Sequence, residues 1–375
     1  MPKVSIVLPT YNGEDYLRES IESVIAQSFT DWELIIVNDC STDSTPQIAD
    51  EYAAKDCRIR VIHNQTNQKL PNSLNIGFES ASGDYLTWTS DDNIFHHEAL
   101  IKMHDFLLHN NYCMVCARMR YIDNNGHVLS LIPEDFCSDS FYYTNNVRAC
   151  FMYKRCVLDS IGQYDSDLFC VEDYDYWMRI MIHYKKIGFI PEILYYYRMH
   201  NNSLSSTHYA KVRKQLARMR NKYDAEIVAA LKNTPSYLWQ IYLDFIENSK
   251  FCEPLSEKYI AELPEIKYDS LPGKNKKIVI FGSGQWGQKV LQMLNGKACF
   301  FVDNDDQKIG QKIENIEVIS FEKLKSISQE NDNILIVIAV QNKWSYDIVH
   351  QLYQNHIYNY CSLPLFINSV KNETE

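Results

Sequence analysis

The chain has 375 residues, of which 46% are apolar and 23% are charged, a composition typical of a globular protein that can bury a core. Its 37 basic and 48 acidic residues give a formal net charge of −11, which argues against general binding to the phosphate backbone of nucleic acids. The length exceeds that of one ordinary domain, so we expect two domains and a connecting segment.

Several further patterns favour a cytoplasmic protein. No stretch reaches the roughly 18 consecutive apolar residues of a membrane-spanning helix, and the N-terminus lacks the pattern of a secretory signal. The 11 cysteines show no regular spacing, which is typical of reduced thiols. Cys113 and Cys116 form one CxxC pair without a second pair at zinc-finger spacing, so buried cysteines are favoured over a structural zinc site.

The first 110 residues alternate short β-rich runs with helical periods. Helices are expected at 16–26, where Leu17, Ile21 and Val24 share one face, and from 41–45 onward. Strands are expected at 4–8, 34–37, 59–62 and 85–88. This alternation predicts an α/β fold with a parallel sheet and a ligand site at the carboxyl ends of its strands.

Polar residues that a folded core would not require follow three of these strands, at 9–12, 38–43 and 89–93. The three loops should converge at one edge of the sheet. Asp39 comes directly after a buried strand and is well placed to accept hydrogen bonds from the N–H groups of a nucleotide base. Asp43 is favoured as a helix cap, because Asp-x-Thr before a helix is a capping pattern.

Asp91 and Asp92 are adjacent acids after the strand expected at 85–88. Two carboxylates held together repel each other, and a divalent cation would relieve this repulsion. An alternative interpretation is a polar turn in which Asp92 caps the helix expected around 97–108.

Beyond residue 112 the pattern is less regular until a helix expected at 174–181. Residues 208–260 have helical periodicity, and prolines at 254, 264 and 272 indicate a linker. A second β-α-β pattern begins at Lys277. We therefore expect one domain at 1–207, a helical connector at 208–274 and a second domain at 275–368.

An ordered set of motifs between residues 2 and 206 closely resembles the signature of glycosyltransferase family 2, which has the GT-A fold. The two longest motifs run from Val4 to Thr45, beginning VSIVLPTYN, and from Asn72 to Asn93, beginning NSLNIG and ending TSDDN. The shorter motifs are Cys150–Met152, Ile161–Asp165, Glu172–Trp177 with Arg179, Tyr197–His200 and Ser203.

The resemblance implies inverting transfer of a sugar from a nucleotide-diphosphate donor, usually a UDP-sugar, to an acceptor hydroxyl. It implies a hexosyl- or N-acetylhexosaminyltransferase of cell-surface polysaccharide, lipopolysaccharide or glycoprotein glycan synthesis, with a glycan or lipid-linked acceptor. By the family pattern, Asp173 is the catalytic base with Glu172 beside it, and Mn²⁺ or Mg²⁺ is held by Asp92 with Asp91 and His200. The implied donor-binding residues are Pro9, Thr10, Tyr11, Asp39, Asn75, Asp91 and Arg198.

Two positions depart from the family pattern. Thr89 stands where the family often has the first acid of Asp-x-Asp-Asp, which leaves the set of metal ligands open. Lys69 stands where a glycine is frequent, and solvent exposure is favoured slightly over a phosphate contact.

Asp173 is expected to begin a helix whose Trp177, Ile180 and Met181 face the core, which would aim its carboxylate into the site. The helix dipole should then lower the pKa of Asp173 and keep it ionised. The alternative is that Glu172 and Asp173 merely cap the helix.

The second domain opens with a glycine-rich turn in the context of a dinucleotide-binding fingerprint. Gly282, Gly284 and Gly287 follow a strand at 277–281 and precede a helix at 288–294, and the next strand ends in Asp303. The domain has about 90 residues, half of a full dinucleotide fold. It resembles the small Rossmann-like modules attached to sugar O-acyltransferases and other surface-polysaccharide enzymes. A second nucleotide site and a structural or homo-oligomerising role both remain open.

Six basic residues cluster in the connector: Lys211, Arg213, Lys214, Arg218, Arg220 and Lys222. They could form a solvated helix face, or they could dock onto anionic lipid where a lipid-linked acceptor is presented. We therefore expect a cytoplasmic protein that could lie at the inner face of the cytoplasmic membrane.

Two other functions compete with a glycosyltransferase. A nucleotidyltransferase shares the sheet and the paired acids, but it would need a glycine-rich basic loop where residues 9–12 read PTYN. A non-catalytic sugar-nucleotide-binding protein would have no need of Asp173 and His200.

Overall fold

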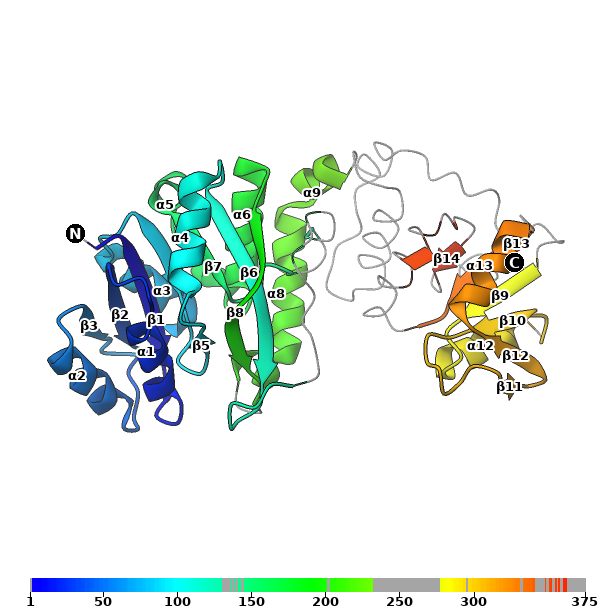
Figure 1. The fold of residues 1–375 in the computed structure, drawn as a ribbon, viewed down its shortest axis with the longest axis horizontal. Helices are drawn as coiled ribbons and strands as arrows, with labels where there is room; N and C mark the ends of the chain where they lie inside the picture. The colour runs from blue at the N-terminus through cyan, green and yellow to red at the C-terminus, as the bar shows by residue number, and fades with distance from the viewer. Residues whose placement is uncertain are drawn as a thin grey trace. The chain divides into compact units, whose positions relative to one another are not determined.

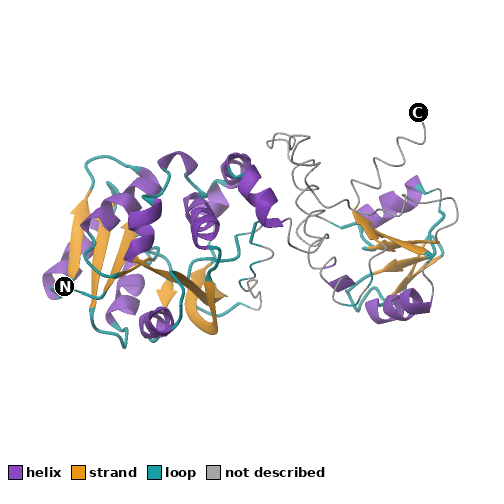
Figure 2. Cartoon of the chain, turned by 90° about the horizontal axis from the view of Figure 1, so that it is seen from above, coloured by secondary structure: helices purple, strands orange, loops and turns teal. Residues whose placement is uncertain are grey.

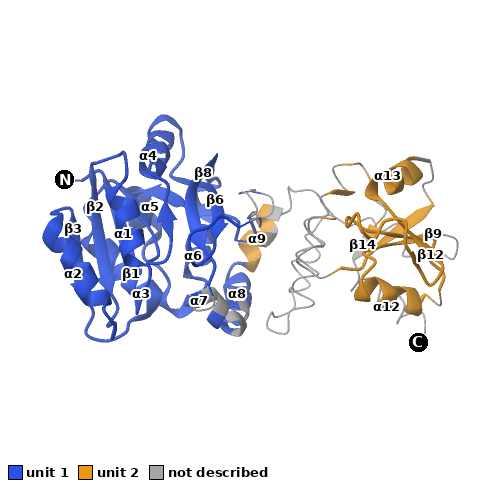
Figure 3. Ribbon diagram, turned by 60° about the horizontal axis from the view of Figure 1, so that its bottom comes forward, with its two compact units in different colours: residues 1–223 blue, residues 224–375 orange. Residues whose placement is uncertain are grey.

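The computed structural model describes residues 2–231 and 277–362, except for 130–135, 137, 139–140, 143–144, 201–202, 295, 331–332, 341–347, 349–350, 353–354, 356 and 358–359. The chain divides into two compact units, Met1–Tyr223 and Asp224–Glu375 (Figure 3). The linker prolines at 254, 264 and 272 lie outside the described residues, and the boundaries expected at 207, 274 and 368 remain predictions.

The first unit contains a mixed sheet with the strand order β3-β2-β1-β4-β7-β6-β8-β5. Its N-terminal half is parallel, as the sequence predicts: β2 pairs with β1 and β3, and β1 pairs with β4. The strands are β1 (Val4–Thr10), β2 (Trp32–Asn38), β3 (Ile59–His63) and β4 (Tyr85–Trp88). The helices between them are α1 (Leu17–Ile25), α2 (Thr45–Lys55) and α3 (Lys69–Ser80) (Figure 1).

The other half of the sheet is mainly antiparallel. β7 pairs antiparallel with β4 and β6, and β5 with β8, whereas β6 and β8 run parallel. The strands are β5 (Ile94–Phe95), β6 (Met114–Ile122), β7 (Phe151–Lys154) and β8 (Gly188–Arg198). The helices of this half are α4 (Ala99–His109), α5 (Arg155–Ile161), the 3₁₀ helix η1 (Ser166–Leu168) and α6 (Glu172–Tyr184).

Every residue of β1, β2 and β4 is buried. Parallel strands that are covered on both faces require such continuous apolar runs, and helices flank the strands in Figure 2. Leu17, Ile21 and Val24 of α1 belong to the same core, which confirms the helix face predicted from the sequence. The carboxyl ends of β1, β2 and β4 are therefore carried by the most buried part of the unit.

In the described residues up to 231, the sheet is followed by α7 (Leu204–Thr207), α8 (Tyr209–Lys222) and α9 (Asp224–Leu231). α8 lies within the first unit, and its Ala217 and Met219 are buried. None of the helices in the described ranges is long and apolar enough to cross a membrane.

The second unit contains a smaller mixed sheet with the order β11-β12-β10-β9-β13-β14. Its neighbouring strands are parallel except β11 and β12, which form an antiparallel pair. This is the α/β arrangement that the strand–glycine turn–helix–strand pattern predicts. The strands are β9 (Lys277–Phe281), β10 (Phe300–Val302), β11 (Lys312–Ile313), β12 (Ile316–Ile319), β13 (Ile334–Ile338) and β14 (Tyr360–Ser362). Its helices include α12 (Gln285–Met293) and α13 (Phe321–Glu330).

Candidate active site

The loops after β1, β2 and β4 meet at the carboxyl edge of the sheet, as the sequence predicts. The backbone N–H of Asp39 donates to the carbonyl of Thr10 over 2.9 Å, and the Thr10 hydroxyl donates to Oδ2 of Asp91 over 2.5 Å. The first loop is also bonded to the second, because Asn12 Oδ1 accepts from the N–H of Thr42. The polar residues that follow three separate strands thus form one connected group.

Gly13 allows the close approach of the first and third loops. A Cβ atom at this position would lie 2.2 Å from Oδ2 of Asp91 and 2.7 Å from Oγ1 of Thr10. No side chain fits at such a distance, so glycine is required for the Thr10–Asp91 contact in this geometry.

Asp39 is buried and accepts three hydrogen bonds from its own chain. Its Oδ1 accepts from the Asn64 side chain over 2.8 Å and from the N–H of Gln68 over 2.7 Å, and its Oδ2 accepts from the N–H of Lys69 over 2.9 Å. Lys69 itself has a positive φ of 69°, and its side chain is exposed, as favoured from the sequence. Asp39 therefore holds the start of α3, and a contact with a nucleotide base stays a prediction.

The other proposed base and ribose residues differ in exposure. Pro9 is buried in β1, whereas Tyr11 is 52% exposed. Asn75 makes a reciprocal pair with the backbone of Tyr164, donating to its carbonyl and accepting from its N–H over 2.9 Å each. Asp43 accepts from the N–H of Thr45, the first residue of α2, but the N-cap residue of α2 is Ser44, so Asp43 lies one residue before the cap position favoured for it.

Asp91 and Asp92 lie in two different environments. Exclusion of water, followed by repulsion from Asp92, raises the pKa of Asp91 to about 7. Asp92 Oδ2 contacts His200 Nε2 over 2.9 Å, and this contact raises the pKa of His200. Oδ1 of Asp92 is buried and has no hydrogen-bond partner within the described residues.

This buried oxygen fits a cation site, because an unpaired carboxylate oxygen in a dry environment is costly without a positive partner. Asp92 is not the cap of the following helix, since α4 begins only at Ala99 with Glu98 as its N-cap residue. The ligand atoms of Asp91, Asp92 and His200 are not all within 4.8 Å of one another. Within the described residues, the ligand atoms of His96, His97 and Glu98 do lie within 4.8 Å of one another. Glu98 of this group is already paired with Lys102.

Arg198 is fully buried, and its guanidinium is bonded within the protein. Nε donates to the carbonyl of Asp92 over 3.0 Å, and the terminal nitrogens donate to Glu19 and to the carbonyls of Asp123 and Asn124. The guanidinium also lies 4.4 Å from the centre of the Tyr16 ring. Arg198 thus fixes the backbone of Asp92, and a direct contact with a donor remains a prediction.

Thr89 occupies the position at which the family often has an acid. It is fully buried, and its hydroxyl lies 2.7 Å from the hydroxyl of Tyr195 on β8. Tyr195 was not singled out from the sequence, because one tyrosine in a tyrosine-rich strand gives no signal of its partner.

The start of α6 carries the two acids expected for catalysis. Asp173 is partly buried, and it accepts from the Asn145 side chain over 3.0 Å and from the N–H of Tyr174 over 2.6 Å. Glu172 is buried and accepts from the N–H of Cys170 over 2.6 Å. The N-cap residue of α6, Val171, makes no side-chain capping bond. Asp173 does accept from an N–H of the first turn, so the alternative that these acids cap the helix stays open.

The electrostatics of this pair differ from the expectation. Burial raises the pKa of Asp173, so the prediction that the helix dipole would lower it is wrong. Burial, followed by repulsion from Asp173, raises the pKa of Glu172 to about 8. The expected burial of Trp177, Ile180 and Met181 is confirmed.

Aromatic packing connects α6 with the end of β4. The Trp177 and Phe151 rings are 4.4 Å apart between centroids, and Phe151 lies 5.8 Å from Trp88. Trp88 is the last residue of β4, three positions before Asp91. A continuous buried cluster thus supports both the paired acids and the helix that begins at Glu172.

The glycine-rich turn of the second unit is built as its fingerprint predicts. A Cβ atom on Gly287 would lie 1.9 Å from the carbonyl oxygen of Gly282, so α12 packs directly against the turn, whereas the space beside Gly284 is open. Asp303 Oδ2 accepts from the N–H and hydroxyl of Ser283 over 3.0 and 2.5 Å and from Lys308. The four predicted residues come together, but the acid is already hydrogen-bonded, and nucleotide binding stays a prediction.

The two cysteines of the CxxC pair differ in burial. Cys116 is buried, as favoured from the sequence, and its thiol donates to the carbonyl of Gly188, whereas Cys113 is only partly buried.

The parallel-to-mixed α/β sheet, with paired acids after β4 and an acidic helix start at α6, defines a GT-A-like glycosyltransferase domain. Residues 5–162 match the model of glycosyl transferase family 2, and this part of the chain is a glycosyltransferase family 2 domain. Residues 274–360 match a family described as C2185-like, N-terminal, which leaves the kind of the second domain unassigned.

Relatives of the chain include several bacterial proteins. An uncharacterized glycosyltransferase of Haemophilus influenzae is 36% identical over 132 residues, which is 35% of this chain and 53% of the relative. The putative glycosyltransferase EpsE of Bacillus subtilis is 41% identical over 139 residues, 36% of this chain and 50% of the relative. The chain thus spans about half the length of these two relatives.

Two further similarities extend over more of the chain. The putative teichuronic acid biosynthesis glycosyltransferase TuaG of Bacillus subtilis is 29% identical over 223 residues, 57% of this chain and 85% of the relative. Among solved structures, S. aureus TarS 1-349 in complex with UDP is 22% identical with a TM-score of 0.48, and the match covers 70% of this chain and 83% of that chain.

Proposed function

We propose that the protein is an inverting glycosyltransferase that moves a sugar from a nucleotide-diphosphate donor, a UDP-sugar, to an acceptor hydroxyl. The observation that carries this proposal is the pair of acids after β4. Asp91 is bonded to Thr10, Asp92 is bonded to His200, and one buried oxygen of Asp92 has no partner among the described residues. The pair belongs to a glycosyltransferase family 2 domain.

Asp92, with Asp91 and His200, would hold Mn²⁺ or Mg²⁺ in this proposal. When bound, the ion would act as a Lewis acid that stabilises the negative charge of the departing diphosphate. The acidic excess of the chain supports this assignment, because an acidic protein that binds a diphosphate benefits from a cation between them.

Asp173 acts as the general base. Its carboxylate takes the proton of the acceptor hydroxyl as the acceptor oxygen bonds to the anomeric carbon, and the bond from that carbon to the diphosphate breaks with its electron pair on the leaving group. The raised pKa of Asp173 makes it a stronger base than an exposed carboxylate. Glu172 is turned toward the N–H of Cys170 and supports this helix start.

The nucleotide is held by the loops after β1 and β2. The exposed ring of Tyr11 offers a face for stacking on the base, and Asp39 would accept from a base N–H with the lone pairs its own chain leaves unused. Thr10 orients Asp91 toward the ribose or the ion, and Pro9, Asn75 and Arg198 shape the donor site.

The acceptor is a glycan or lipid-linked intermediate of cell-surface polysaccharide, lipopolysaccharide or glycoprotein glycan synthesis, and the transferred sugar is a hexose or an N-acetylhexosamine. The name of one relative, the putative teichuronic acid biosynthesis glycosyltransferase TuaG, supports the polysaccharide assignment. We further propose that the protein binds at the inner face of the cytoplasmic membrane.

A panel of nucleotide sugars tests the function, with the full chain incubated with Mn²⁺, Mg²⁺ or a chelator. We expect metal-dependent release of the nucleoside diphosphate, faster when an acceptor glycan is present. Release of pyrophosphate instead would identify a nucleotidyltransferase. Binding of a nucleotide sugar without any turnover would identify a non-catalytic binding protein.

A further inference from the structure

The segment that leads into the candidate base is held by contacts from a different part of the chain. Residues 165–171 contain η1 and end at Val171, the N-cap residue of α6. Cys170 in this segment has a φ of 82°, a left-handed conformation that is unfavourable for a residue with a side chain. Such a conformation persists only where surrounding contacts hold it.

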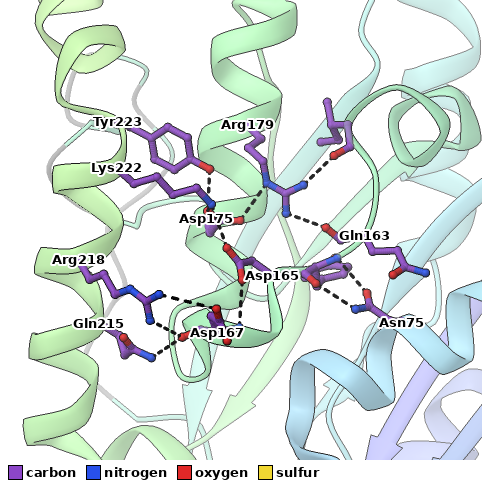
Figure 4. A network of polar contacts seen from close by, with 12 residues as sticks. Asn75, Gln163, Asp165, Asp167, Asp175, Arg179, Gln215, Arg218, Lys222 and Tyr223 are labelled. Atoms are coloured by element: carbon purple, nitrogen blue, oxygen red, sulfur yellow. Dashed lines mark hydrogen bonds and ion pairs between the residues drawn. The ribbon is translucent and has the colours of Figure 1, made fainter.

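Lys222 supplies two of these contacts, one on each side of the segment. Its ammonium lies 2.9 Å from Oδ2 of Asp165 and 3.2 Å from Oδ1 of Asp175 (Figure 4). Asp165 directly precedes η1, and Asp175 lies in the first turn of α6, two residues after Asp173. One lysine at the end of α8 thus joins both ends of the stretch that contains the candidate base.

Asp175 is fully buried, and its two oxygens accept from three groups. Oδ1 accepts from the hydroxyl of Tyr223 over 2.7 Å as well as from Lys222, and Oδ2 accepts from Nε of Arg179 over 2.9 Å. Removing the partners of a buried carboxylate is strongly destabilising. The position of the start of α6 therefore depends on these donors.

The same face of α8 contacts the rest of the segment. Gln215 donates to the carbonyl of Asp167 over 2.7 Å, Arg218 donates to the same carbonyl over 3.3 Å, and the Lys211 ammonium lies 4.3 Å from the centre of the Phe169 ring. Residues 211, 215, 218 and 222 are spaced by four, three and four, which places them on one side of a helix. This side of the basic helix packs on an acidic segment of its own domain.

Arg179 extends the hydrogen-bond network toward α3, which carries the implied donor-binding residue Asn75. Its terminal nitrogens donate to the carbonyls of Ile161 and Gln163 over 2.8 and 2.9 Å. The next residue, Tyr164, is paired with Asn75 of α3 (Figure 4). The contacts from α8 therefore extend both to α6, which carries Asp173, and to α3, which carries Asn75.

We propose that Lys222 and Tyr223 are positioning residues for glycosyl transfer, which fix the Asp173 carboxylate by holding Asp165 and Asp175. This inference rests on the proposed function. The two residues lie beyond residues 5–162, the part of the chain that matches the family model. Their contacts with Asp165 and Asp175 are therefore a feature of this chain outside the matched region.

The test compares four variants of the full chain by steady-state kinetics with a UDP-sugar donor in the absence of lipid. Lys222→Met keeps the length of the side chain and removes its charge, Lys222→Arg keeps the charge, and Tyr223→Phe removes one hydroxyl. Lys214→Met is the matched control, because Lys214 is an exposed lysine of the same helix.

We expect kcat of Lys222→Met to fall by about tenfold to a hundredfold, with the donor KM and the UDP affinity changed by less than about twofold. Lys222→Arg should recover most of this loss, Tyr223→Phe should show a smaller fall in kcat, and Lys214→Met should behave as wild type. Tyr223→Phe and Lys222→Arg keep the test informative if Lys222→Met is poorly folded.

A normal kcat in Lys222→Met and Tyr223→Phe overturns the inference while the proposed function stands. A loss of kcat that Lys222→Arg does not recover, or that comes with an equal loss of UDP affinity, also overturns it, since either result indicates a general structural role. If wild type releases no nucleotide from any donor, the proposed function fails and this inference falls with it.

Discussion

His200 Nε2 lies 2.9 Å from Oδ2 of Asp92, while the other oxygen of the same carboxylate is buried without a partner among the described residues. The two oxygens of one side chain are thus in unequal environments. The histidine holds the rotamer of Asp92, and the second oxygen remains available to a cation. This arrangement leads to the first prediction.

Asp92→Asn should weaken the binding of Mn²⁺ by about tenfold or more, because a neutral amide replaces a charged oxygen ligand. Isothermal titration with Mn²⁺ in the presence of UDP measures the effect. Asp31→Asn, a change at an exposed aspartate outside the site, serves as the control. Equal Mn²⁺ affinity in Asp92→Asn and wild type would show that Asp92 is not a ligand.

Asp173→Asn should lower the rate of transfer by on the order of 10²- to 10⁴-fold, since the amide cannot accept the proton of the acceptor. The affinity for UDP should be retained, because the amide keeps the size of the side chain and its contact with Asn145 can persist. Kinetics and UDP titration are measured on the same preparation, with Asp159→Asn as an exposed control. Transfer at the wild-type rate would exclude Asp173 as the base.

Glu172→Gln should stabilise the protein at neutral and alkaline pH. The pKa of Glu172 is about 8 in the folded protein, against an ordinary value of 4.5. Between these values the folded state holds a proton that the unfolded chain has released, so the stability of wild type falls as the pH rises through this window. Glutamine resembles the protonated acid and removes this penalty.

The expected gain in unfolding free energy for Glu172→Gln is on the order of 1–3 kcal/mol at about pH 8, and it should shrink toward about pH 4.5. Denaturant unfolding across this range measures it, with the exposed Glu322→Gln as the control. A difference from wild type that does not change with pH would contradict the raised pKa.

Gly287→Ala should destabilise the second unit by about 1–3 kcal/mol or more, since the added Cβ would lie 1.9 Å from the carbonyl oxygen of Gly282. Gly284→Ala is the matched control in the same turn, because a Cβ there meets nothing within 4 Å. Thermal unfolding of the full chain compares the two. If both variants melt like wild type, α12 does not pack on the turn as the structure has it.

The parallel half of the first sheet could be predicted because each strand is a short apolar run bounded by polar loops. Tyr85–Trp88 and Lys277–Phe281 agree with their predicted bounds. The antiparallel half could not be predicted in the same way. β5 has two residues, and β6 and β8 shift register near Arg118, so neither carries a regular period.

The sequence indicates which polar residues lie at the carboxyl edge of the sheet, but it does not indicate the partners of their side chains. Asp39 was expected to face a ligand, and it also accepts from Gln68 and Lys69 at the start of α3. Arg198 was expected at the donor, and its guanidinium is bonded to the backbone of Asp92. Such partners lie far apart in the chain, and no local pattern encodes a contact between them.

The direction of a pKa shift also could not be predicted from the sequence. The position of Asp173 at a helix start suggests a lowered pKa, but the shift depends on how much water the surrounding side chains exclude. Asn145, which contacts Asp173, comes from a stretch without any periodicity.

The contacts of Lys222 also determine how far a fragment of the first unit must extend to keep the donors to Asp175. A fragment that stops at residue 207 would lack Lys222 and Tyr223 and would leave Arg179 as the remaining one of the three donors to Asp175. A fragment that runs through Tyr223 keeps both donors and ends where the first compact unit ends. A fragment made to test the proposed transfer reaction should therefore include α8, although this helix carries none of the proposed catalytic residues.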